Sequence, residues 1–275
     1  MKIAAAPISW GVCEVPGWGH QLDAERVLTE MRALGITATE LGPDGFLSPD
    51  ILKNHDMRAI GGFVPVVLHE PGHDPLRGLK DLTDGFAEET VVVLAAVTGA
   101  EGYDTRPALD ADGWRTLLGN LDRITAELPR QVTLHPHVGT MVENAAEVRR
   151  VLDGCGVKLC LDTGHLLIGG TDPLDLALRE PHRIAHAHLK DVNATLAAQV
   201  QAGTLSYTEA VKIGIYRPLG EGDVDIAGII ASLTKSSYDG WYVMEQDVIL
   251  TTTPPPGEGP ITDVRTSLDY LRALP

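Results

Sequence analysis

The chain has 275 residues, 44% of them hydrophobic, and a formal net charge of −16. This is enough apolar sequence for one large core, and the negative charge makes nucleic acid and anionic membrane surfaces poor partners. No run of about 18 apolar residues predicts a membrane span, and the start Met1–Ala4 lacks the pattern of a signal peptide. The three cysteines follow no CxxC spacing, so we expect reduced thiols and a cytoplasmic protein.

Short apolar runs, rich in β-branched residues or alanine, recur along the whole chain, as expected for strands buried on both faces. We predict eight strands, at Ile3–Trp10, Thr37–Leu41, Ala59–Leu68, Val91–Thr98, Gln131–His135, Val157–Leu161, Ile184–Leu189 and Gly240–Glu245. Helical spacing or a capping sequence predicts the helices between and after them, at Ala24–Leu34, from Pro49 after the cap Ser48, at Lys80–Glu89, Trp114–Leu128, Ala145–Leu152, Pro173–Leu178, Ile226–Leu233 and Val264–Leu271.

The alternation of strand and helix predicts an α/β protein with one domain, a single (β/α)8 TIM barrel over residues 1–275. An open doubly wound sheet is the alternative, but the Gly-rich first turn that it usually shows is missing from Trp10–Glu14. One long interruption, Asp191–Asp223, separates the seventh strand from its helix. We expect it to cross the C-terminal face of the barrel and to lie over the site, because long insertions in barrels are usually functional.

Histidines and carboxylates gather where the predicted strands end, which is where barrel enzymes place their functional residues. The residues at or next to these ends are Glu40, His69, His135, His137, Asp162, His165, His186, His188, Lys190 and Glu245. Imidazole and carboxylate ligands on converging strands favour one divalent ion of Mn, Co, Fe or Zn, because Mg and Ca prefer oxygen ligands. Glu245 follows four apolar residues, and a buried carboxylate needs a compensating charge.

Simpler interpretations exist for each of these residues. A single histidine at a strand end is often only a structural residue, and Asp162 can cap the turn that follows it. Lys190 can form a salt bridge with Asp191. His186 shares the face of His188 but lies one layer deeper in the barrel.

Three motifs resemble those of the xylose-isomerase-like barrels of sugar isomerases and epimerases. The motifs are Leu161–His165, His186–Asp191 and Gly240–Glu245. The resemblance implies a divalent metal held by residues of the fifth to eighth strands, with Asp162, His188 and Glu245 matching three of the four positions. The fourth position is a Glu in that superfamily; here His135 is the expected ligand, and His137 or Glu143 are the alternatives.

A narrower resemblance covers nearly the whole chain. Its segments are Ala6–Gly11, Thr39–Gly42, His135–Thr140, Arg183–Val192 and Pro218–Asp223, and they are similar to those of myo-inosose-2 dehydratases. The resemblance implies a lyase that removes water from a keto-inositol. Val12–Pro16 and Glu245–Asp247 depart from the dehydratase pattern, and the stretch between the third and fourth strands is shorter than in that family.

A metal at the rim of the barrel can polarise a ketone and ease removal of the neighbouring proton, giving an enediolate. Loss of a β-hydroxyl then gives dehydration, and reprotonation gives isomerisation or epimerisation. The candidate catalytic residues are Glu245, Lys190, His165, Glu40 and His69. Trp10 and His137 are the candidates for contact with a polyol ketone substrate, although Trp10 can also simply fill the barrel top.

We therefore expect a metal-dependent carbon–oxygen lyase acting on a keto-inositol, with a metal-dependent sugar or keto-sugar isomerase or epimerase as the alternative. A third possibility is a metal-binding barrel without catalysis. An endonuclease of the same superfamily would need a basic face, which the charge of −16 excludes. A homodimer is compatible with the sequence, but one sequence does not decide it.

Overall fold

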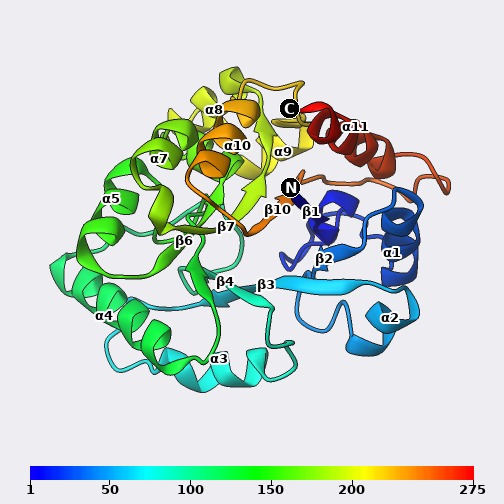
Figure 1. Ribbon diagram of the computed structural model, residues 1–275. Helices are drawn as coiled ribbons and strands as arrows, with labels where there is room; N and C mark the ends of the chain where they lie inside the picture. Colours follow the sequence, from blue (N-terminus) through cyan, green and yellow to red (C-terminus); the bar gives the residue numbers. More distant parts are fainter.

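Eight parallel strands form a closed barrel in the computed structural model, which describes residues 1–275 (Figure 1). The strands are β1 (Lys2–Ala5), β2 (Ala38–Glu40), β3 (Arg58–Val66), β4 (Val91–Ala96), β5 (Val132–Leu134), β6 (Lys158–Asp162), β7 (Ile184–Leu189) and β10 (Trp241–Met244). Each strand pairs with its neighbours in chain order, and β10 closes the barrel against β1. The predicted (β/α)8 fold is confirmed.

Helices surround the barrel (Figure 1). They are α1 (Ala24–Ala33), α2 (Pro49–Asn54), α3 (Pro75–Thr83), α4 (Ala111–Glu127), α5 (Ala145–Gly154), α6 (Thr163–Ile168), α7 (Pro173–Arg179), α10 (Ile226–Lys235) and α11 (Pro260–Ala273). Most begin at a side-chain cap, such as Ser48 for α2 and Asn144 for α5. None of the helices is long and apolar enough to cross a bilayer.

Most predicted elements differ from the structure by a few residues at their ends, and the largest errors are in two of them. The first strand ends at Ala5 rather than Trp10, because Pro7 begins a one-turn 3-10 helix, η1 (Pro7–Trp10), which stops at the left-handed Gly11. The helix predicted at Lys80–Glu89 begins earlier, at Pro75, and ends at Thr83. Its start is fixed by the Asp74 side chain, which accepts a hydrogen bond from the backbone N–H of Leu76.

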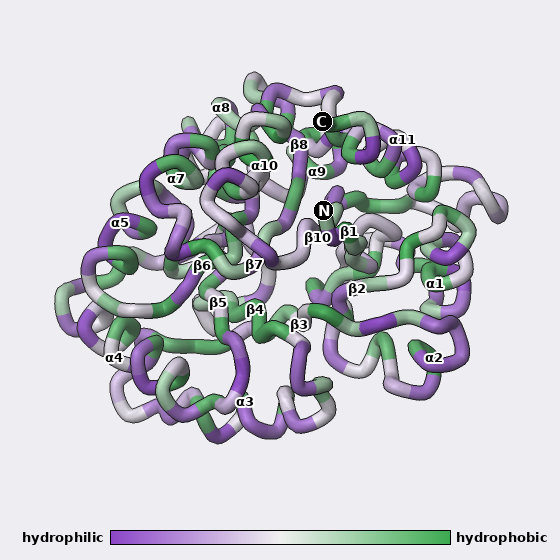
Figure 2. Tube along the Cα trace, in the orientation of Figure 1, coloured by the Kyte–Doolittle hydropathy of each residue, from purple (hydrophilic) through white to green (hydrophobic).

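The main core lies between the strands and the inward faces of the helices, as the hydrophobic colour of β4 and β5 and the alternating colours of α4 indicate (Figure 2). The stripe predicted on α4 faces this core: Trp114, Leu117, Leu121 and Ile124 are buried. The packing of the helices against the strands fixes the positions of the strand ends that carry the polar residues.

The segment of residues 191–223 has secondary structure of its own. It contains β8 (Asp191–Val192), α8 (Ala194–Gln201), α9 (Tyr207–Lys212) and β9 (Tyr216–Arg217), and β8 pairs with β9 in an antiparallel ribbon outside the barrel. Asp191 fastens its last part, because its carboxylate accepts hydrogen bonds from four backbone N–H groups, those of Val192, Gly220, Gly222 and Val224. A smaller apolar cluster, which includes Tyr207 and Tyr216, packs the segment against residues such as Trp18 and Ile168.

Candidate active site and metal centre

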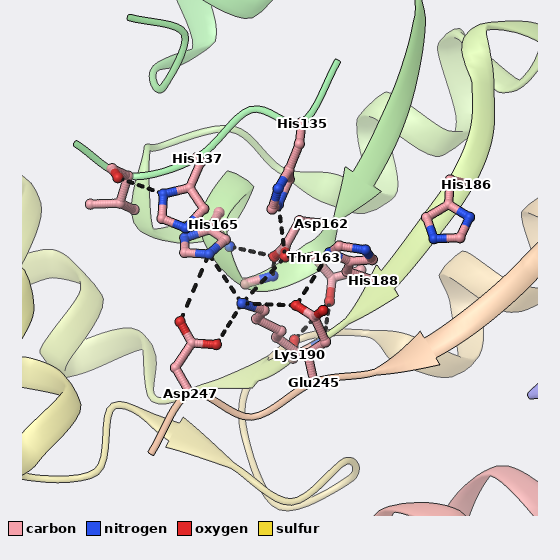
Figure 3. A network of polar contacts seen from close by, with 12 residues as sticks. His135, His137, Asp162, Thr163, His165, His186, His188, Lys190, Glu245 and Asp247 are labelled. Atoms are coloured by element: carbon pink, nitrogen blue, oxygen red, sulfur yellow. Dashed lines mark hydrogen bonds and ion pairs between the residues drawn. The ribbon is translucent and has the colours of Figure 1, made fainter. Parts of the chain in front are cut away.

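Four polar side chains converge where β5, β6, β7 and β10 end (Figure 3). His135 and Glu245 follow β5 and β10 directly, while Asp162 and His188 are register partners on β6 and β7. His135 Nε2 lies 3.2 Å from Asp162 Oδ2, and His188 Nδ1 lies 3.5 Å from the same oxygen. Glu245 Oε2 lies 3.2 Å from His188 Nδ1. All four side chains are buried.

The two carboxylate oxygens of Asp162 have different partners: one caps helix α6 and the other faces the cluster. Oδ1 accepts hydrogen bonds from the backbone N–H groups of Gly164 and His165, at 2.9 and 2.8 Å, and so caps α6. Oδ2 faces the cluster. Asp162 therefore caps the helix, as the simpler interpretation expected. The cap uses only Oδ1, and it fixes the carboxylate so that Oδ2 remains available to the cluster.

The orientation of His188 is set by Glu40, which ends β2. A carboxylate only accepts, so His188 Nε2–H donates to Glu40 Oε1 at 2.8 Å, and His186 Nε2–H donates to the same oxygen at 2.7 Å. His188 Nδ1 then faces the two carboxylates of Asp162 and Glu245, at 3.5 and 3.2 Å. Burial lowers the pKa of His188, but Cys160 and the carboxylates of Glu245 and Glu40 raise it well above its usual range, so this nitrogen carries a proton when no metal is bound. A divalent ion bound here would replace that proton, and the residues fit such an ion because ligand atoms of His135, Asp162 and His188 lie within 4.8 Å of one another.

The three alternatives for the fifth-strand position lie in different places. His135 is the one that contacts Asp162. His137 donates from Nδ1 to the carbonyl oxygen of Val138, and its ring stacks on that of His165 at 3.6 Å. Glu143 is turned away from the cluster, because its carboxylate pairs with Arg106 at 3.0 Å and accepts from the backbone of Gly139.

Lys190 continues the inward face of β7, two residues beyond His188. Its Nζ lies 2.6 Å from Asp247 Oδ1, 3.1 Å from Glu245 Oε2 and 3.1 Å from His165 Nε2 (Figure 3). The salt bridge considered between Lys190 and Asp191 is absent, because the Asp191 carboxylate is occupied by backbone N–H groups. The ammonium is thus directed at the cluster rather than at its neighbour in sequence.

The charges of the cluster offset the cost of burial. Burial alone would lower the pKa of Lys190, but the carboxylates of Asp162, Asp247 and Glu245 hold that pKa well above its usual range. Burial, followed by the nearby His137 and Lys190, lowers the pKa of His165 well below its usual range. Lys190 is therefore an ammonium and His165 a neutral imidazole at neutral pH.

Glu40 lines the pocket and orients two histidines through Oε1. Burial would raise its pKa, but His188 and His186 outweigh that effect and keep the pKa of Glu40 below its usual range. Two further residues expected in the site lie elsewhere. His69 follows β3 and does not line the pocket. Trp10 is fully buried in the main core, where its indole N–H donates to Glu30 of α1 at 2.8 Å.

A pocket opens above the cluster, and aromatic side chains close around it. Its charged and imidazole lining is Glu14, Glu40, His135, His137, His188, Lys190, Glu245 and Asp247, and its aromatic lining is Trp18, Phe63, Tyr103 and Tyr207. Tyr207, from α9, donates to Asp247 Oδ2 at 2.7 Å. The pocket thus contains the aromatic surface expected of Trp10, but it comes from other residues.

Sequence reasoning missed Asp247, Tyr207, Tyr216 and Trp18. Asp247 had a usable signal, because a residue two places after Glu245 on an extended chain points the same way. Tyr207 and Tyr216 had none, since they lie in the long interruption where no element was predicted.

The sequence model of the xylose isomerase-like TIM barrel family matches residues 85–274. The chain belongs to this family. The match covers the second half of the barrel, where all four residues of the cluster lie.

Relatives with known names align with most of the chain. An inosose dehydratase of Lacticaseibacillus casei is 29% identical over 267 residues, which cover 90% of each chain. The rhizopine catabolism protein MocC of Rhizobium meliloti is 32% identical over 265 residues, covering 90% of this chain and 82% of MocC. Among solved structures, the IOLI protein with a bound zinc atom is 12% identical and superposes with a TM-score of 0.67, covering 100% of this chain and 98% of that one.

Proposed function

We propose that this protein is a metal-dependent lyase that removes water from a keto-inositol. The observation that supports it most is the placement of a carboxylate and an ammonium side by side on one wall of the pocket, with Glu245 Oε2 and Lys190 Nζ 3.1 Å apart. Dehydration needs both a group that accepts a proton from carbon and a group that gives one to the departing hydroxyl. The relatives named inosose dehydratases, which align over most of the chain, support the choice of substrate.

His135, Asp162, His188 and Glu245 would hold one divalent ion. When bound, such an ion would polarise the ketone oxygen and a neighbouring hydroxyl of the substrate as a Lewis acid. A donor set of two imidazoles and two carboxylates favours Mn, Co, Fe or Zn. Glu40 would keep His188 in the tautomer that presents Nδ1.

Glu245 is the proton acceptor in this proposal. Its contacts within the protein, with His188 and Lys190, are made by Oε2, which leaves Oε1 for the substrate. The charges of His188 and Lys190 outweigh the effect of burial and keep the pKa of Glu245 below its usual range, so it is ionised at neutral pH. Of the other candidates in the cluster, His165 accepts from Lys190 through Nε2, and Glu40 orients His188 and His186 through Oε1.

Lys190 is the proton donor. The proton next to the ketone passes to Glu245, the bond between the β-carbon and its hydroxyl breaks, and the hydroxyl takes a proton from Lys190 Nζ and leaves as water. A carbon–carbon double bond conjugated with the ketone remains. Because Glu245 and Lys190 are in contact, the proton taken from carbon returns to Lys190, and both groups regain their charges.

The aromatic wall suits a ring-shaped polyol. Phe63, Tyr103 and Tyr207 line the pocket together with the polar side chains, and aromatic rings can cover the C–H face of a cyclitol while excluding water. Exclusion of water strengthens the charged contacts of Glu245 and Lys190.

The experiment is a substrate panel with the purified protein, loaded in turn with Mn, Co, Fe and Zn. We expect a keto-inositol to lose one water, detected by mass spectrometry, with at least one of these metals, and to be unchanged after chelation. A ketohexose that is epimerised while keto-inositol is untouched would overturn the proposed reaction and support an epimerase. No reaction of any polyol ketone with any metal would overturn the catalytic proposal.

A further inference from the structure

Five buried side chains form a closed ring of hydrogen bonds that begins and ends at Lys190. Its members, called here the Lys190 ring, are Lys190, His165, Tyr216, Tyr207 and Asp247. His165 and Asp247 follow β6 and β10, whereas Tyr207 and Tyr216 belong to α9 and β9 of residues 191–223. The ring therefore joins the barrel to the segment that crosses its face.

The chemistry of the members fixes the direction of every bond. An ammonium only donates, so Lys190 Nζ donates to His165 Nε2 at 3.1 Å. The other ring nitrogen, Nδ1–H, then donates to the Tyr216 oxygen at 3.4 Å. Tyr207 must donate to the carboxylate of Asp247 at 2.7 Å, so it accepts from Tyr216 O–H, with the two oxygens 3.0 Å apart.

The last bond closes the ring, because Lys190 Nζ donates to Asp247 Oδ1 at 2.6 Å. Every donor has an acceptor, and a single tautomer of His165, with its proton on Nδ1, satisfies the whole ring. Since hydrogen bonds in such a chain polarise one another, removing one hydroxyl weakens the others as well.

The ring uses two of the three N–H bonds of Lys190. The third N–H bond is directed toward the cluster, where Glu245 Oε2 lies 3.1 Å from Nζ. A lysine on a flexible four-carbon stem has no fixed direction of its own. The ring supplies that direction by holding the ammonium from two sides, and Tyr207 and Tyr216 hold in turn the two acceptors, Asp247 and His165.

We propose that Tyr207 and Tyr216 are positioning residues that act through Asp247 and His165 to aim the Lys190 ammonium at the departing hydroxyl. This inference rests on the proposed dehydration. It assigns residues 191–223 to the second half of the reaction, loss of the hydroxyl, and leaves the first half, transfer of the proton from carbon to Glu245, to the barrel. Misplacement of a reacting group by about 1 Å can cost roughly a hundredfold in rate.

The experiment follows both halves in one sample. Keto-inositol is incubated in deuterated water with metal-loaded protein; NMR then measures exchange of the proton next to the ketone, and mass spectrometry measures water loss. The variants are Tyr207→Phe and Tyr216→Phe, each of which removes one hydroxyl. Tyr242→Phe is the matched control, because the Tyr242 hydroxyl is buried but has no hydrogen-bond partner.

We expect Tyr207→Phe to lower the turnover number for water loss about tenfold to a hundredfold, while exchange changes less than about threefold. Tyr216→Phe should have a smaller effect of the same kind, about threefold to tenfold, because Asp247 still accepts from Tyr207. The ratio of exchange to water loss should rise in both variants and stay at the original value in Tyr242→Phe. Metal content and the thermal unfolding midpoint should be similar in all folded variants.

A merely structural role for the two tyrosines predicts a different pattern. Exchange and water loss would then fall together, with an unchanged ratio, and this result in either folded variant would overturn the inference. Unchanged water loss in both variants would overturn it as well. If the unsubstituted protein gives neither exchange nor water loss, the proposed function itself fails, and that outcome is distinguishable because it appears before any substitution.

Discussion

The pocket has two walls that come from different parts of the fold. The wall with His135, Asp162, His188 and Glu245 is built on strand ends of the closed barrel, where Glu40 fixes the orientation of His188. The other part, with Tyr207 in the lining and Tyr216 hydrogen-bonded to it, comes from a ribbon and short helices outside the barrel. In the proposed reaction the strand-end wall suits binding of a metal and removal of a proton, whereas the outer wall governs loss of the hydroxyl.

The difference between the two walls also bears on the choice between dehydration and isomerisation. A metal site on the barrel can serve dehydration and isomerisation alike, because both begin with loss of the proton next to a ketone. The outcome then depends on where a second proton donor is held. In this chain the proposed donor, Lys190, is held between Glu245 on one side and the Lys190 ring, through Asp247 and Tyr207, on the other.

Removing the proton acceptor should give the largest effect. Glu245→Gln is expected to lower both proton exchange and water loss with keto-inositol by at least about a thousandfold, because it removes a proton acceptor and a metal ligand together. Exchange is measured by NMR in deuterated water. Circular dichroism should be unchanged, since the main core does not include this carboxylate. Retained exchange in the folded variant would show that another residue is the base.

Removing the link between the two walls should separate the two halves of the reaction. Asp247→Asn is expected to lower water loss about a hundredfold and exchange far less, because the amide no longer attracts the ammonium of Lys190 and can turn an N–H₂ group toward it. The ratio of the two rates is the measurement. Equal losses of both would show that Asp247 supports the whole pocket rather than the donor.

Removing the charge of Glu40 should weaken metal binding. Glu40→Gln is expected to weaken divalent metal binding about tenfold, measured by competition with a chromogenic chelator, because the loss of charge lowers the basicity of His188. Glu25→Gln is a matched control, since Glu25 pairs with His55 at 2.7 Å on the exposed surface. Equal metal affinity in the two variants would contradict the role given to Glu40.

Much of the strand-end wall of the pocket could be predicted from the sequence. Buried parallel strands are read as apolar runs, and their ends fall at one rim of the barrel, so the pattern alone places Asp162, His188 and Glu245 together. Asp162 also shows why simple and functional interpretations need not compete, because one oxygen caps α6 and the other faces the cluster.

The outer wall could not be predicted in the same way. Helices α8 and α9 are short and lack a strong apolar stripe, so no period pointed to Tyr207. The sequence predicts contact between Trp10 and the substrate only if the first strand continues through Pro7 to the barrel rim. The break at Pro7 turns the indole into the core instead, where it reaches Glu30.

The smallest effect should come from that misassigned tryptophan. Trp10→Phe removes the hydrogen bond to Glu30 and is expected to lower the free energy of unfolding by about 1–3 kcal/mol, because the bond is buried and its acceptor is charged. Chemical denaturation measures the change. The KM for keto-inositol should stay the same. A raised KM with unchanged stability would instead indicate that Trp10 contacts the substrate.

The most direct test of the account concerns Lys190 itself. In the Lys190→Met variant, loaded with metal, keto-inositol in deuterated water should still exchange the proton next to the ketone, because Glu245 and the metal ligands remain, while water loss should fall at least about a hundredfold. That result would establish Lys190 as the donor that makes this barrel a dehydratase. Water loss at the original rate in the folded variant would contradict the account.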